Sequence, residues 1–493
     1  MNDLFSRLGG DGVALENGVR SVPRAQLLAD AQRLAAALTR LQLTSVALYA
    51  DNGIDWIVAD LACLHAGIRV TPLPLFFSPG QIAHAVLTCG ADALLTDQPL
   101  TDLPFVSASA REDLPADGLA LYRLDACGPD AVALPEGTHK ITFTSGTTGT
   151  PKGVCLSATQ QLGVADVLAR AVATTTTRHL CVLPLSTLLE NLAGVYAPLL
   201  AGGTVIAPGL AELGLTGSSE LDIHRLIGSI ARHRPGSLIL VPQMLSALTA
   251  AAEHGWVPPT SLEFIAVGGG KVSPDLLHRA RAAGLPAYEG YGLSECASVV
   301  SLNVPGADRP GTVGRPLPHV GVRIDDGEIV VTGNAFLGYA GLPESWGGAQ
   351  VHTGDLGRLD EDGFIVIEGR RKNLLVTSYG RNLSPEWVEA ELLCGPFLRQ
   401  AVVFGDAQPY CVALLLPRDE ATTDEAIATW IDRINGRLPD YARVRDWARL
   451  PRPLSSHDRT ATDNGRPRRR NIECLYRAVI DGLYQHHQEA LGQ

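Results

Sequence analysis

The chain has 493 residues, of which 46% are hydrophobic and 19% are charged, values typical of a globular protein of two or three domains. Its formal net charge of -12 argues against a nucleic-acid partner held by a broad basic surface. The nine cysteines form no CxxC pair and no Cys/His cluster, which favours free thiols in a reducing cytoplasm. The N-terminal residues lack the apolar core of a signal peptide, so a cytoplasmic location is expected.

Short strand-like runs alternate with helical ones along the first half of the chain. The first is an Ala/Leu-rich amphipathic helix predicted over Gln26–Leu41, opened by Ser21 and Pro23. The later runs are Val46–Tyr49, Trp56–His65, Ala93–Thr96, Ile141–Thr144, Leu180–Leu183, Leu238–Val241 and Phe264–Val267. This alternation predicts an α/β fold in which helices cover parallel sheets.

The segment Leu192–Ala211 is uncharged and long enough to cross a bilayer. Its prolines and glycines, among them Pro198, Gly202 and Gly203, prevent one continuous helix. We therefore predict a buried helix, a Gly-Gly turn and a buried strand over Thr204–Ala207, with no transmembrane segment.

Antiparallel hairpins are predicted over Gly321–Thr332 and Gly357–Glu368, because each contains an acidic-Gly turn pair. The composition changes at the arginine-rich stretch after Gly369. The remaining part is predicted to be a smaller α+β segment of about 120 residues, a size that suits an independent domain.

The stretch Ile141–Val154, ITFTSGTTGTPKGV, carries the strongest indication of function. It gathers hydroxyl groups, glycine backbone N–H groups and the ammonium of Lys152 in one loop, as binding of a polyphosphate requires. It is not a Walker A loop, because Gly153 follows Lys152 where Ser or Thr would supply a Mg²⁺ ligand. The expected phosphate-binding residues are Thr144, Ser145, Gly146, Thr147, Thr148, Gly149 and Lys152.

This loop resembles the phosphate loop of the adenylate-forming superfamily, which contains acyl-CoA synthetases, luciferases and adenylation domains of nonribosomal peptide synthetases. Further motifs follow in the family's order: Tyr291–Glu295 (YGLSE), His352–Asp355 (HTGD), Gly369–Lys372 (GRRK), Gly380–Glu386 (GRNLSPE) and, in weaker form, Asn464–Arg470. The resemblance implies a large N-terminal domain over residues 1–371, made of helix-covered β-sheets with a small barrel-like part. It also implies a small mobile α+β domain over residues 372–493, a hinge near Lys372 and an active site between the domains.

The resemblance further implies ATP and Mg²⁺ as cofactors, with Glu295 and Thr144 as metal ligands. Tyr291 would lie against adenine, and Ser294 would contact the α-phosphate. Taken alone, Glu295 could equally be a solvated loop charge, and Tyr291 a core or loop aromatic residue. Further ATP contacts are expected from Gly269, Gly270, Glu289, Gly290 and Gly292.

Two residues near the hairpins are assigned to ATP by the same resemblance. Asp355 is predicted to lie in a sharp glycine-containing turn, where its carboxylate would accept both ribose hydroxyls. The alternative is a turn aspartate that bonds its own backbone. Arg370 would reach the ribose or the α-phosphate.

The acyl pocket is expected around Leu185, Thr187 and Gly268, where the family binds the acid. Amino-acid-activating members carry an aspartate at the place of Leu185, and a buried ammonium without such a partner costs several kcal/mol. The acid is therefore predicted to be uncharged beyond its carboxylate and mostly apolar. The stretch Thr377–Glu389 resembles fatty acyl-CoA synthetases.

The main departure from the family lies near the C-terminus, where Arg466 replaces a lysine that bridges the acyl carboxylate and the α-phosphate. Arginine keeps the charge but presents it as a planar fork. Arg468–Arg470 form either a solvated basic edge or a contact for CoA phosphates or an acidic carrier protein. Gly380 would leave room for the pantetheine arm in the thiol channel.

The predicted function is that of an AMP-forming acyl-CoA synthetase of fatty acid metabolism, with Lys152, Glu295 and Arg466 as catalytic residues and CoA as co-substrate. One alternative is adenylation with transfer to an acyl or peptidyl carrier protein, an amine or a hydroxyl. A second alternative is a non-catalytic nucleotide- or acyl-binding protein, suggested by Arg466.

Overall fold

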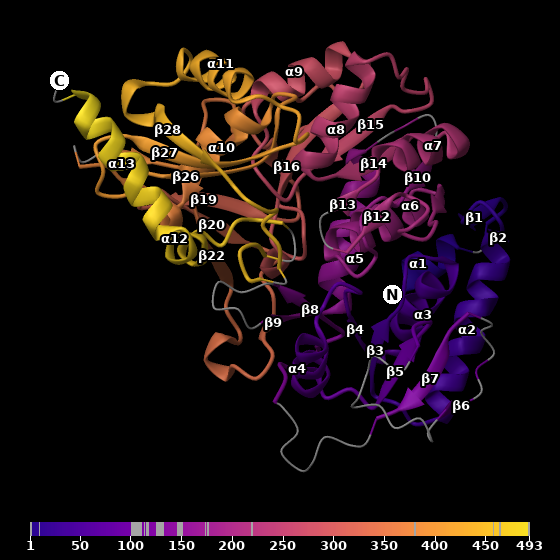
Figure 1. Cartoon of the computed structure of the whole chain (residues 1–493). Coiled ribbons are helices and arrows are strands. Elements are labelled where there is room, and N and C mark those ends of the chain that lie inside the picture. The colour runs from indigo at the N-terminus through magenta and orange to yellow at the C-terminus, as the bar shows by residue number, and fades with distance from the viewer. Residues whose placement is uncertain are drawn as a thin grey trace.

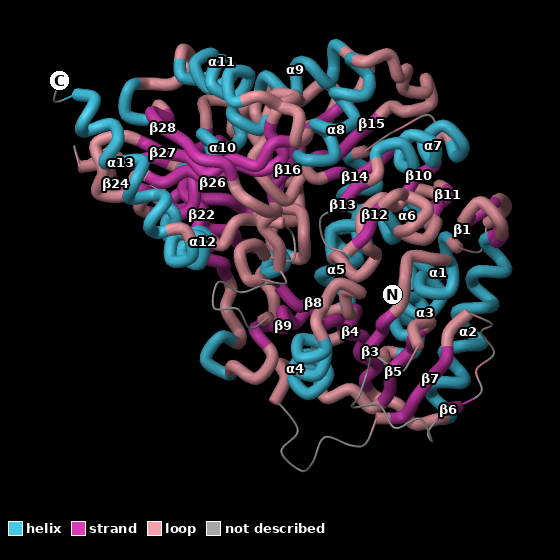
Figure 2. The backbone as a smooth tube through the Cα atoms, viewed as in Figure 1, coloured by secondary structure: helices cyan, strands magenta, loops and turns pink. Residues whose placement is uncertain are grey.

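The computed structural model describes residues 2–8, 10–99, 111–112, 114, 118–124, 133–144, 151–172, 174, 177–217, 220–378, 381–456, 458–462 and 465–491. Figure 1 shows the N-terminal elements, from indigo to magenta, on one side of the molecule and the C-terminal elements, orange and yellow, on the other. Figure 2 shows that strands run through both parts, with helices around them. The predicted α/β class is confirmed.

The first large sheet has eight strands and holds the strand that leads into the phosphate loop. Its order is β21 (Gly338–Tyr339), β9 (Lys152–Leu156), β8 (Lys140–Thr144), β4 (Arg69–Pro72), β3 (Ser45–Tyr49), β5 (Ala93–Thr96), β7 (Ala120–Arg123) and β6 (Arg111–Glu112). The strands β8, β4, β3 and β5 are parallel, and all five residues of β3 are buried. A parallel strand covered on both faces requires such a continuous apolar run.

The second large sheet has nine strands. Its order is β18 (Arg315–Pro316), β17 (Ser301–Leu302), β16 (Ala287–Tyr291), β15 (Phe264–Val267), β14 (Ser237–Leu240), β10 (Arg178–Leu180), β11 (Thr204–Ile206), β1 (Val13–Glu16) and β2 (Ser21–Pro23). The six strands from β16 to β1 run parallel, and the outer strands are antiparallel.

The remaining strands form three smaller antiparallel sheets and one mixed sheet. The predicted hairpins are confirmed in the sheet β19 (Gly321–Asp325), β20 (Glu328–Thr332), β22 (Gln350–Leu359) and β23 (Ile365–Arg370). The C-terminal sheet is β26 (Leu398–Phe404), β27 (Cys411–Pro417) and β28 (Val444–Arg449). The pairs are β12 (Leu215–Thr216) with β13 (Glu220–Leu221), and β24 (Leu375–Val376) with β25 (Asn382–Leu383).

The helices begin where the sequence offers caps. Ser78 and Gln81, and likewise Ser157 and Gln160, form reciprocal capping boxes at the starts of α4 and α5. The helices are α1 (Asn2–Arg7), α2 (Arg24–Arg40), α3 (Ile54–Ala66), α4 (Pro79–Cys89), α5 (Ala158–Ala171), α6 (Ala197–Leu200), α7 (Ile223–His233), α8 (Pro242–Glu253), α9 (Pro274–Ala282), α10 (Pro385–Leu393), α11 (Asp424–Asn435), α12 (Arg469–Leu475) and α13 (Arg477–Leu491). Within the described ranges, no helix is long and apolar enough to span a bilayer.

The segment Leu192–Ala211 follows its prediction, with one addition. A π-helix, η3 (Glu190–Tyr196), runs directly into α6, a turn at Gly202 follows, and β11 is buried. One predicted strand is displaced: the run Leu180–Leu183 shares only Leu180 with β10 (Arg178–Leu180). The reason is that the Leu183 N–H donates to the buried carboxylate of Glu190 (3.1 Å) and not to a neighbouring strand.

A buried polar network joins the two halves of the N-terminal region. Lys140 Nζ, on β8, lies 2.8 Å from Asp60 Oδ1 on α3. Asp60 Oδ2 accepts hydrogen bonds from Asn191 Nδ2 (2.9 Å) and the Tyr196 hydroxyl (2.8 Å), both on η3. Both charged side chains are 1% exposed, so the pair is fully withdrawn from water.

Of the cysteines that the structure describes, seven are buried and one, Cys474 on α12, is exposed. All eight are free thiols. This agrees with the predicted absence of disulfides among them.

Candidate active site

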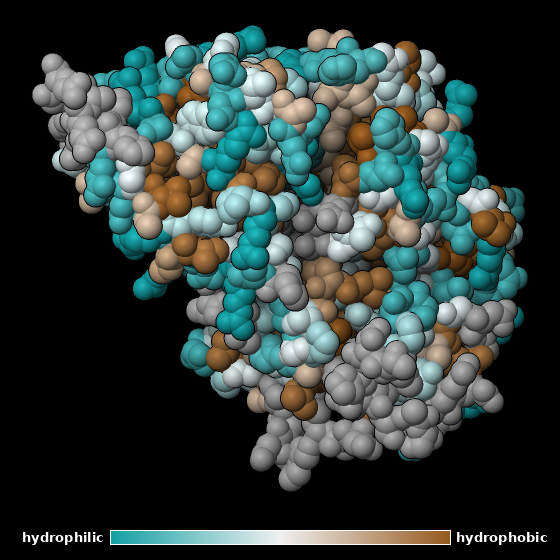
Figure 3. All heavy atoms as spheres, viewed as in Figure 1, coloured by the Kyte–Doolittle hydropathy of each residue, from teal (hydrophilic) through white to brown (hydrophobic). Residues whose placement is uncertain are grey.

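A cavity of about 1610 Å³ lies between the large sheets and the C-terminal part of the chain. Figure 3 shows hydrophilic residues over most of one face and hydrophobic residues gathered toward its middle. Many predicted site residues line the cavity. They are Thr144, Lys152, Thr187, Gly268, Gly269, Gly270, Gly290, Tyr291, Gly292, Ser294, Glu295, Arg370, Lys372 and Arg466.

Thr144 and Lys152 are set opposite each other by the antiparallel pairing of β8 and β9. Thr144 ends β8 and Lys152 begins β9, so both side chains flank the connection between these strands. Five predicted phosphate-binding residues lie outside the described residues, and so does the predicted thiol-channel residue. They are Ser145, Gly146, Thr147, Thr148, Gly149 and Gly380.

Tyr339 connects Lys152 with Glu295. Its hydroxyl donates to Glu295 Oε1 (2.8 Å), and Lys152 Nζ lies 5.0 Å from the centre of its ring. Burial and the Glu295 carboxylate raise the pKa of Tyr339, so it remains a donor. Tyr339 could not be identified from its position in the sequence, because only the pairing of β21 with β9 brings it beside Lys152.

Asp355 binds two residues that line the cavity, Tyr291 and Arg370. The Tyr291 hydroxyl donates to Asp355 Oδ2 (2.7 Å), and Arg370 Nε lies 2.7 Å from Asp355 Oδ1. Asp355 is 4% exposed and lies behind the cavity wall, so it contacts the cavity through these partners. Burial, and next the Asp355 charge, raises the pKa of Tyr291.

The predicted turn at Asp355 is wrong. Asp355 lies within the ten-residue strand β22, paired with Arg370 on β23. Gly354 has φ of 70°, and the pairing with β20 shifts between Glu328 and Val330, so the glycine produces an irregular strand.

Glycines bring the backbone close to the cavity at the end of β16. A Cβ on Gly292 would lie 1.6 Å from the Ser298 carbonyl oxygen, and one on Gly290 would lie 2.9 Å from Leu302 Cδ1. Side chains are therefore excluded at both positions. Glu289 departs from the prediction, because it does not line the cavity. It is 4% exposed and accepts the Val272 N–H (3.1 Å).

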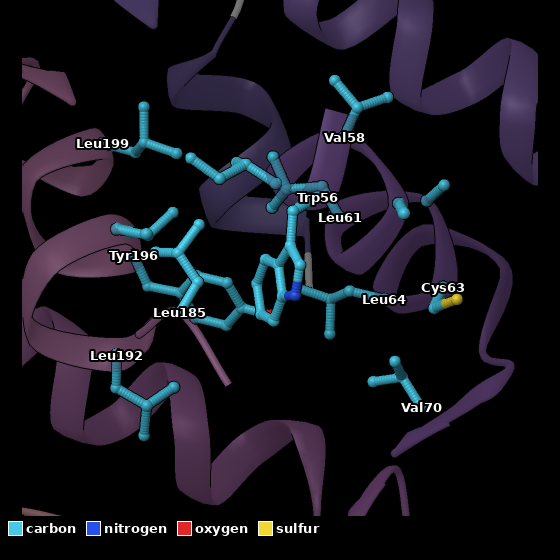
Figure 4. Close-up of a cluster of buried hydrophobic side chains, with 14 of the residues drawn as sticks. Trp56, Val58, Leu61, Cys63, Leu64, Val70, Leu185, Leu192, Tyr196 and Leu199 are labelled. Atoms are coloured by element: carbon cyan, nitrogen blue, oxygen red, sulfur yellow. The ribbon is translucent and has the colours of Figure 1, made fainter. Parts of the chain in front are cut away.

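Leu185 also departs from the predicted acyl pocket. Figure 4 shows it beside Trp56 and Tyr196 in the hydrophobic core, and it is absent from the cavity wall. Its N–H donates to Asn52 Oδ1 (2.7 Å), which turns the chain inward at this point. Thr187 and Gly268 do line the cavity.

Arg466 reaches across from the C-terminal part of the chain. Its Nε donates to the carbonyl oxygen of Gly269 (2.9 Å), and the guanidinium is exposed in the cavity. The neighbouring Arg469 points elsewhere and pairs with Glu389 and Glu386 inside the C-terminal part. Arg469 is therefore neither part of a solvated basic edge nor a contact for CoA phosphates or an acidic carrier protein, the two alternatives predicted for Arg468–Arg470.

One further group combines metal-ligating side chains. His179, Cys181 and Glu190 are buried, and their ligand atoms lie within 4.8 Å of one another. His179 Nε2 and Glu190 Oε1 form a hydrogen bond of 3.0 Å, and Cys181 Sγ donates to the Gly194 carbonyl. The hydrogen bonds of these side chains are therefore already made, and the group does not include the predicted metal ligands Glu295 and Thr144.

Comparison with known proteins gives two family matches in this chain. The model of the AMP-binding enzyme family matches residues 6–339, and that of the AMP-binding enzyme C-terminal domain matches residues 372–488. Two curated relatives are similar over most of the chain. The long-chain-fatty-acid–CoA ligase FadD15 of Mycobacterium bovis is 29% identical over 444 residues (76% of this chain, 73% of the relative). A feruloyl-CoA synthase of Amycolatopsis sp is 28% identical over 482 residues (90% and 94%).

A solved structure has the same fold. It is the O-succinylbenzoate coenzyme A synthetase (MenE) of Bacillus subtilis, in complex with ATP and a magnesium ion. The TM-score is 0.74 at 25% sequence identity, and the match covers 95% of this chain and 98% of the other. The large N-terminal and small C-terminal domains predicted for the fold are thereby confirmed.

Proposed function

The chain belongs to the AMP-binding enzyme family, and from this premise we propose that it is an AMP-forming acid–thiol ligase that uses ATP, Mg²⁺ and CoA. The resemblance to the adenylate-forming superfamily is confirmed by the family match. The relatives are CoA ligases of a fatty, an aromatic and an aryl-succinyl acid, which supports an acid and CoA as substrates.

The first step joins two anions. A carboxylate oxygen of the acid attacks the α-phosphorus of ATP, the bond from that phosphorus to the bridging oxygen breaks, and pyrophosphate leaves. Such a reaction is accelerated by position and by fixed positive charge. The single observation that carries the proposal is one cavity lined by Lys152, Glu295, Tyr291, Arg370 and Arg466.

The charged groups divide into two sets. Lys152, with the phosphate loop, is proposed to hold the β- and γ-phosphates. Arg466 is proposed to bridge the acid carboxylate and the α-phosphate. Its Nε and Nη2 both donate to the Gly269 carbonyl oxygen, and the guanidinium has further donors beyond these two bonds. It enters from the C-terminal part of the chain, so this part must be closed on the cavity during the first step.

The oxygen ligands at Glu295 and Thr144 suit Mg²⁺, which prefers hard oxygen donors. Tyr339 donates to only one Glu295 oxygen, so the carboxylate retains lone pairs for a metal. When bound there, Mg²⁺ would neutralise charge on the phosphates. Lys152 lies beside the ring of Tyr339, and its ammonium group has no lone pair with which to bind a metal.

The nucleoside is proposed to lie against Tyr291, with the ribose toward Asp355 and Arg370. Asp355 has one bond at each oxygen, to Tyr291 and to Arg370, and each oxygen can accept one more. Because the carboxylate is buried behind these two residues, it is proposed to orient them toward the ribose. Ser294, on the same wall, is proposed to contact the α-phosphate.

In the second step the CoA thiol loses its proton, its sulfur attacks the acyl carbonyl, and AMP leaves. We place the domain boundary between residues 371 and 372 and the hinge at Lys372, where the second family match begins. The Gly380 loop would then face the cavity for thioester formation.

The test is acid-dependent release of pyrophosphate from ATP, followed by acyl-CoA formation on addition of CoA. Substituting a carrier protein or an amine for CoA distinguishes the alternative acceptors. If none of the acids tested led to release of pyrophosphate, the chain would not be an enzyme of this class. Adenylation without formation of acyl-CoA would instead indicate a different acceptor.

A further inference from the structure

The cavity continues away from the nucleotide residues along one face of the nine-stranded sheet. Three neighbouring parallel strands are in register there: His179 on β10 lies opposite Ser237 on β14, which lies opposite Phe264 on β15. All three residues line the cavity. They lie toward the end of the cavity that is away from the nucleotide residues, because they lie near the start of their strands. The lining continues past them to Arg178 and Thr177.

The same face carries two nearer rows, because alternate residues of a strand share one face. Ile239 and Ala266 lie opposite each other two residues farther along. Val241 and Gly268 follow the ends of β14 and β15 directly. These four residues also line the cavity, so its floor is a strip of strand residues from Gly268 to Phe264.

The opposite wall is helical. Leu189, Ala193, Ala197 and Ala201, spaced four residues apart along η3 and α6, all line the cavity. Residues at this spacing lie near one face of a helix. Three of the four are alanines, so this wall projects little into the space.

The space between the two walls is open. Ala266 lies in the middle of a central strand and Ala193 in a covered helix, yet both are partly exposed. A Cβ on Gly268 would be in van der Waals contact with Leu189 Cδ2 (3.8 Å), so the missing side chain of Gly268 leaves the space between the strand and this wall. Ala266 and Ala193 therefore border the cavity on one side while they pack against the core on the other.

The channel length follows from the strands. Four residue steps from Gly268 to Phe264, at about 3.3 Å each, give about 13 Å. A zigzag alkyl chain of C–C bonds of about 1.5 Å advances about 1.3 Å per carbon. The strand rows thus lie beside about ten carbons of an alkyl chain, and the cavity continues beyond them.

The polar groups at the far end are already paired. His179 Nδ1 lies 2.9 Å from Ser237 Oγ, and His179 Nε2 lies 3.0 Å from Glu190 Oε1. The Arg178 guanidinium, also at this end, is paired with Glu16 (2.7 Å). A second carboxylate on the substrate would find the Arg178 guanidinium already neutralised, whereas a methyl end requires no partner.

We infer that the acid is a straight-chain, uncharged aliphatic acid of at least about ten carbons, whose alkyl chain lies between the strand rows and the η3–α6 wall. This inference rests on the proposed adenylation. It distinguishes among the acids of the relatives, since an aromatic ring would fill only the part of the channel near Gly268.

The first test measures acid-dependent pyrophosphate release with butanoic, octanoic, decanoic, benzoic and decanedioic acids. Burial of each added methylene should raise kcat/KM by roughly fourfold up to about ten carbons. Benzoic and decanedioic acids should be poorer substrates than decanoic acid. Equal or better use of either acid would overturn the inference. If butanoic, benzoic and decanoic acids all failed to release pyrophosphate, the proposed adenylation itself would be wrong.

The second test blocks the channel from each wall. Ala266→Phe and Ala193→Phe should each lower the ratio of kcat/KM for decanoic acid to that for butanoic acid by roughly 10- to 200-fold. The ratio does not depend on the fraction of folded enzyme. Ala282→Phe, on the exposed end of α9, is the matched control and should leave the ratio unchanged. An unchanged ratio in both channel variants would overturn the inference.

Discussion

Tyr339 places a cation against its ring and a carboxylate at its hydroxyl, so Lys152 and Glu295 form one assembly. Removing either charge should slow pyrophosphate release by roughly 10²–10³-fold, as is usual when an electrostatic group is deleted. The variants are Lys152→Ala and Glu295→Ala, measured at saturating Mg²⁺. Arg323→Ala, at an exposed surface pair, is the control. Full activity in both site variants would disprove the phosphate and metal assignments.

Arg466 is expected to act in one half-reaction. Because it contacts Gly269 across the domains, its charge should matter while the cavity is closed. Arg466→Ala should depress acid-dependent pyrophosphate release and spare transfer from a supplied acyl-adenylate to the thiol. Arg466→Lys should retain much of the first step, since the charge survives. Single-turnover kinetics of the two steps decide: equal loss in both would indicate a damaged domain instead.

Glu289 predicts a pH-dependent stability. Burial raises its pKa from 4.5 to about 8, against the opposing effects of the Val272 N–H and Lys271. The folded state therefore binds the proton more tightly than the unfolded state. Its contribution to stability is complete below pH 4.5 and is lost as the pH rises through about 8.

The variant Glu289→Gln keeps an oxygen for the Val272 N–H but cannot ionise. Thermal unfolding should show the wild type losing Tm relative to this variant as the pH rises from about 4.5 to about 8. A Tm difference that stays constant over this range would contradict the raised pKa.

At the level of elements, the pair Lys140–Asp60 joins α3, β8 and η3. Lys140→Met would leave the Asp60 carboxylate buried without its cation, at a cost of about 3–5 kcal/mol in the free energy of unfolding. Urea denaturation measures this loss. The exposed helix pair Asp166–Arg170 is a matched control, and Arg170→Ala should cost no more than about 0.5 kcal/mol. A similar small loss for Lys140→Met would show that the network is not a determinant of stability.

The strand and helix order could be predicted from the sequence because periodicity and turn residues are local. Phe264–Val267 matches β15, and the hairpin at Asp326-Gly327 matches β19 and β20. The run Trp56–His65, one of the alternating strand-like and helical runs, forms the helix α3, as its length of more than two turns allows.

The errors came from contacts of the folded chain that local periodicity does not encode. Leu183 leaves the sheet because Glu190 takes its N–H, and Leu185 enters the core because Asn52 binds its backbone. The linear sequence contains neither contact. Tyr339 was missed for the same reason, since its role depends on the pairing of two strands far apart in the chain.

For the whole molecule, we propose that the two steps use different positions of the C-terminal domain. Lys372 lies in a short turn, η6 (Arg371–Asn373), between β23 and the C-terminal domain. Lys372→Pro fixes φ near −65° and would restrict rotation there. We expect it to spare pyrophosphate release and to slow acyl-CoA formation by at least about tenfold. Lys372→Ala separates the effect of the charge from that of the backbone. Normal acyl-CoA formation in the proline variant would place the hinge elsewhere.

The exposed thiol of Cys474 offers a direct way to observe this movement. The other described cysteines are buried, and Cys127, which lies outside the described residues, can be replaced in a Cys127→Ser variant. Among the described thiols, a maleimide dye should then attach only to Cys474 on α12. The helix α12 begins three residues after Arg466, so the dye would move together with Arg466, which lines the cavity. Its fluorescence would report opening and closing in solution, during turnover and without any change to the residues that bind substrate.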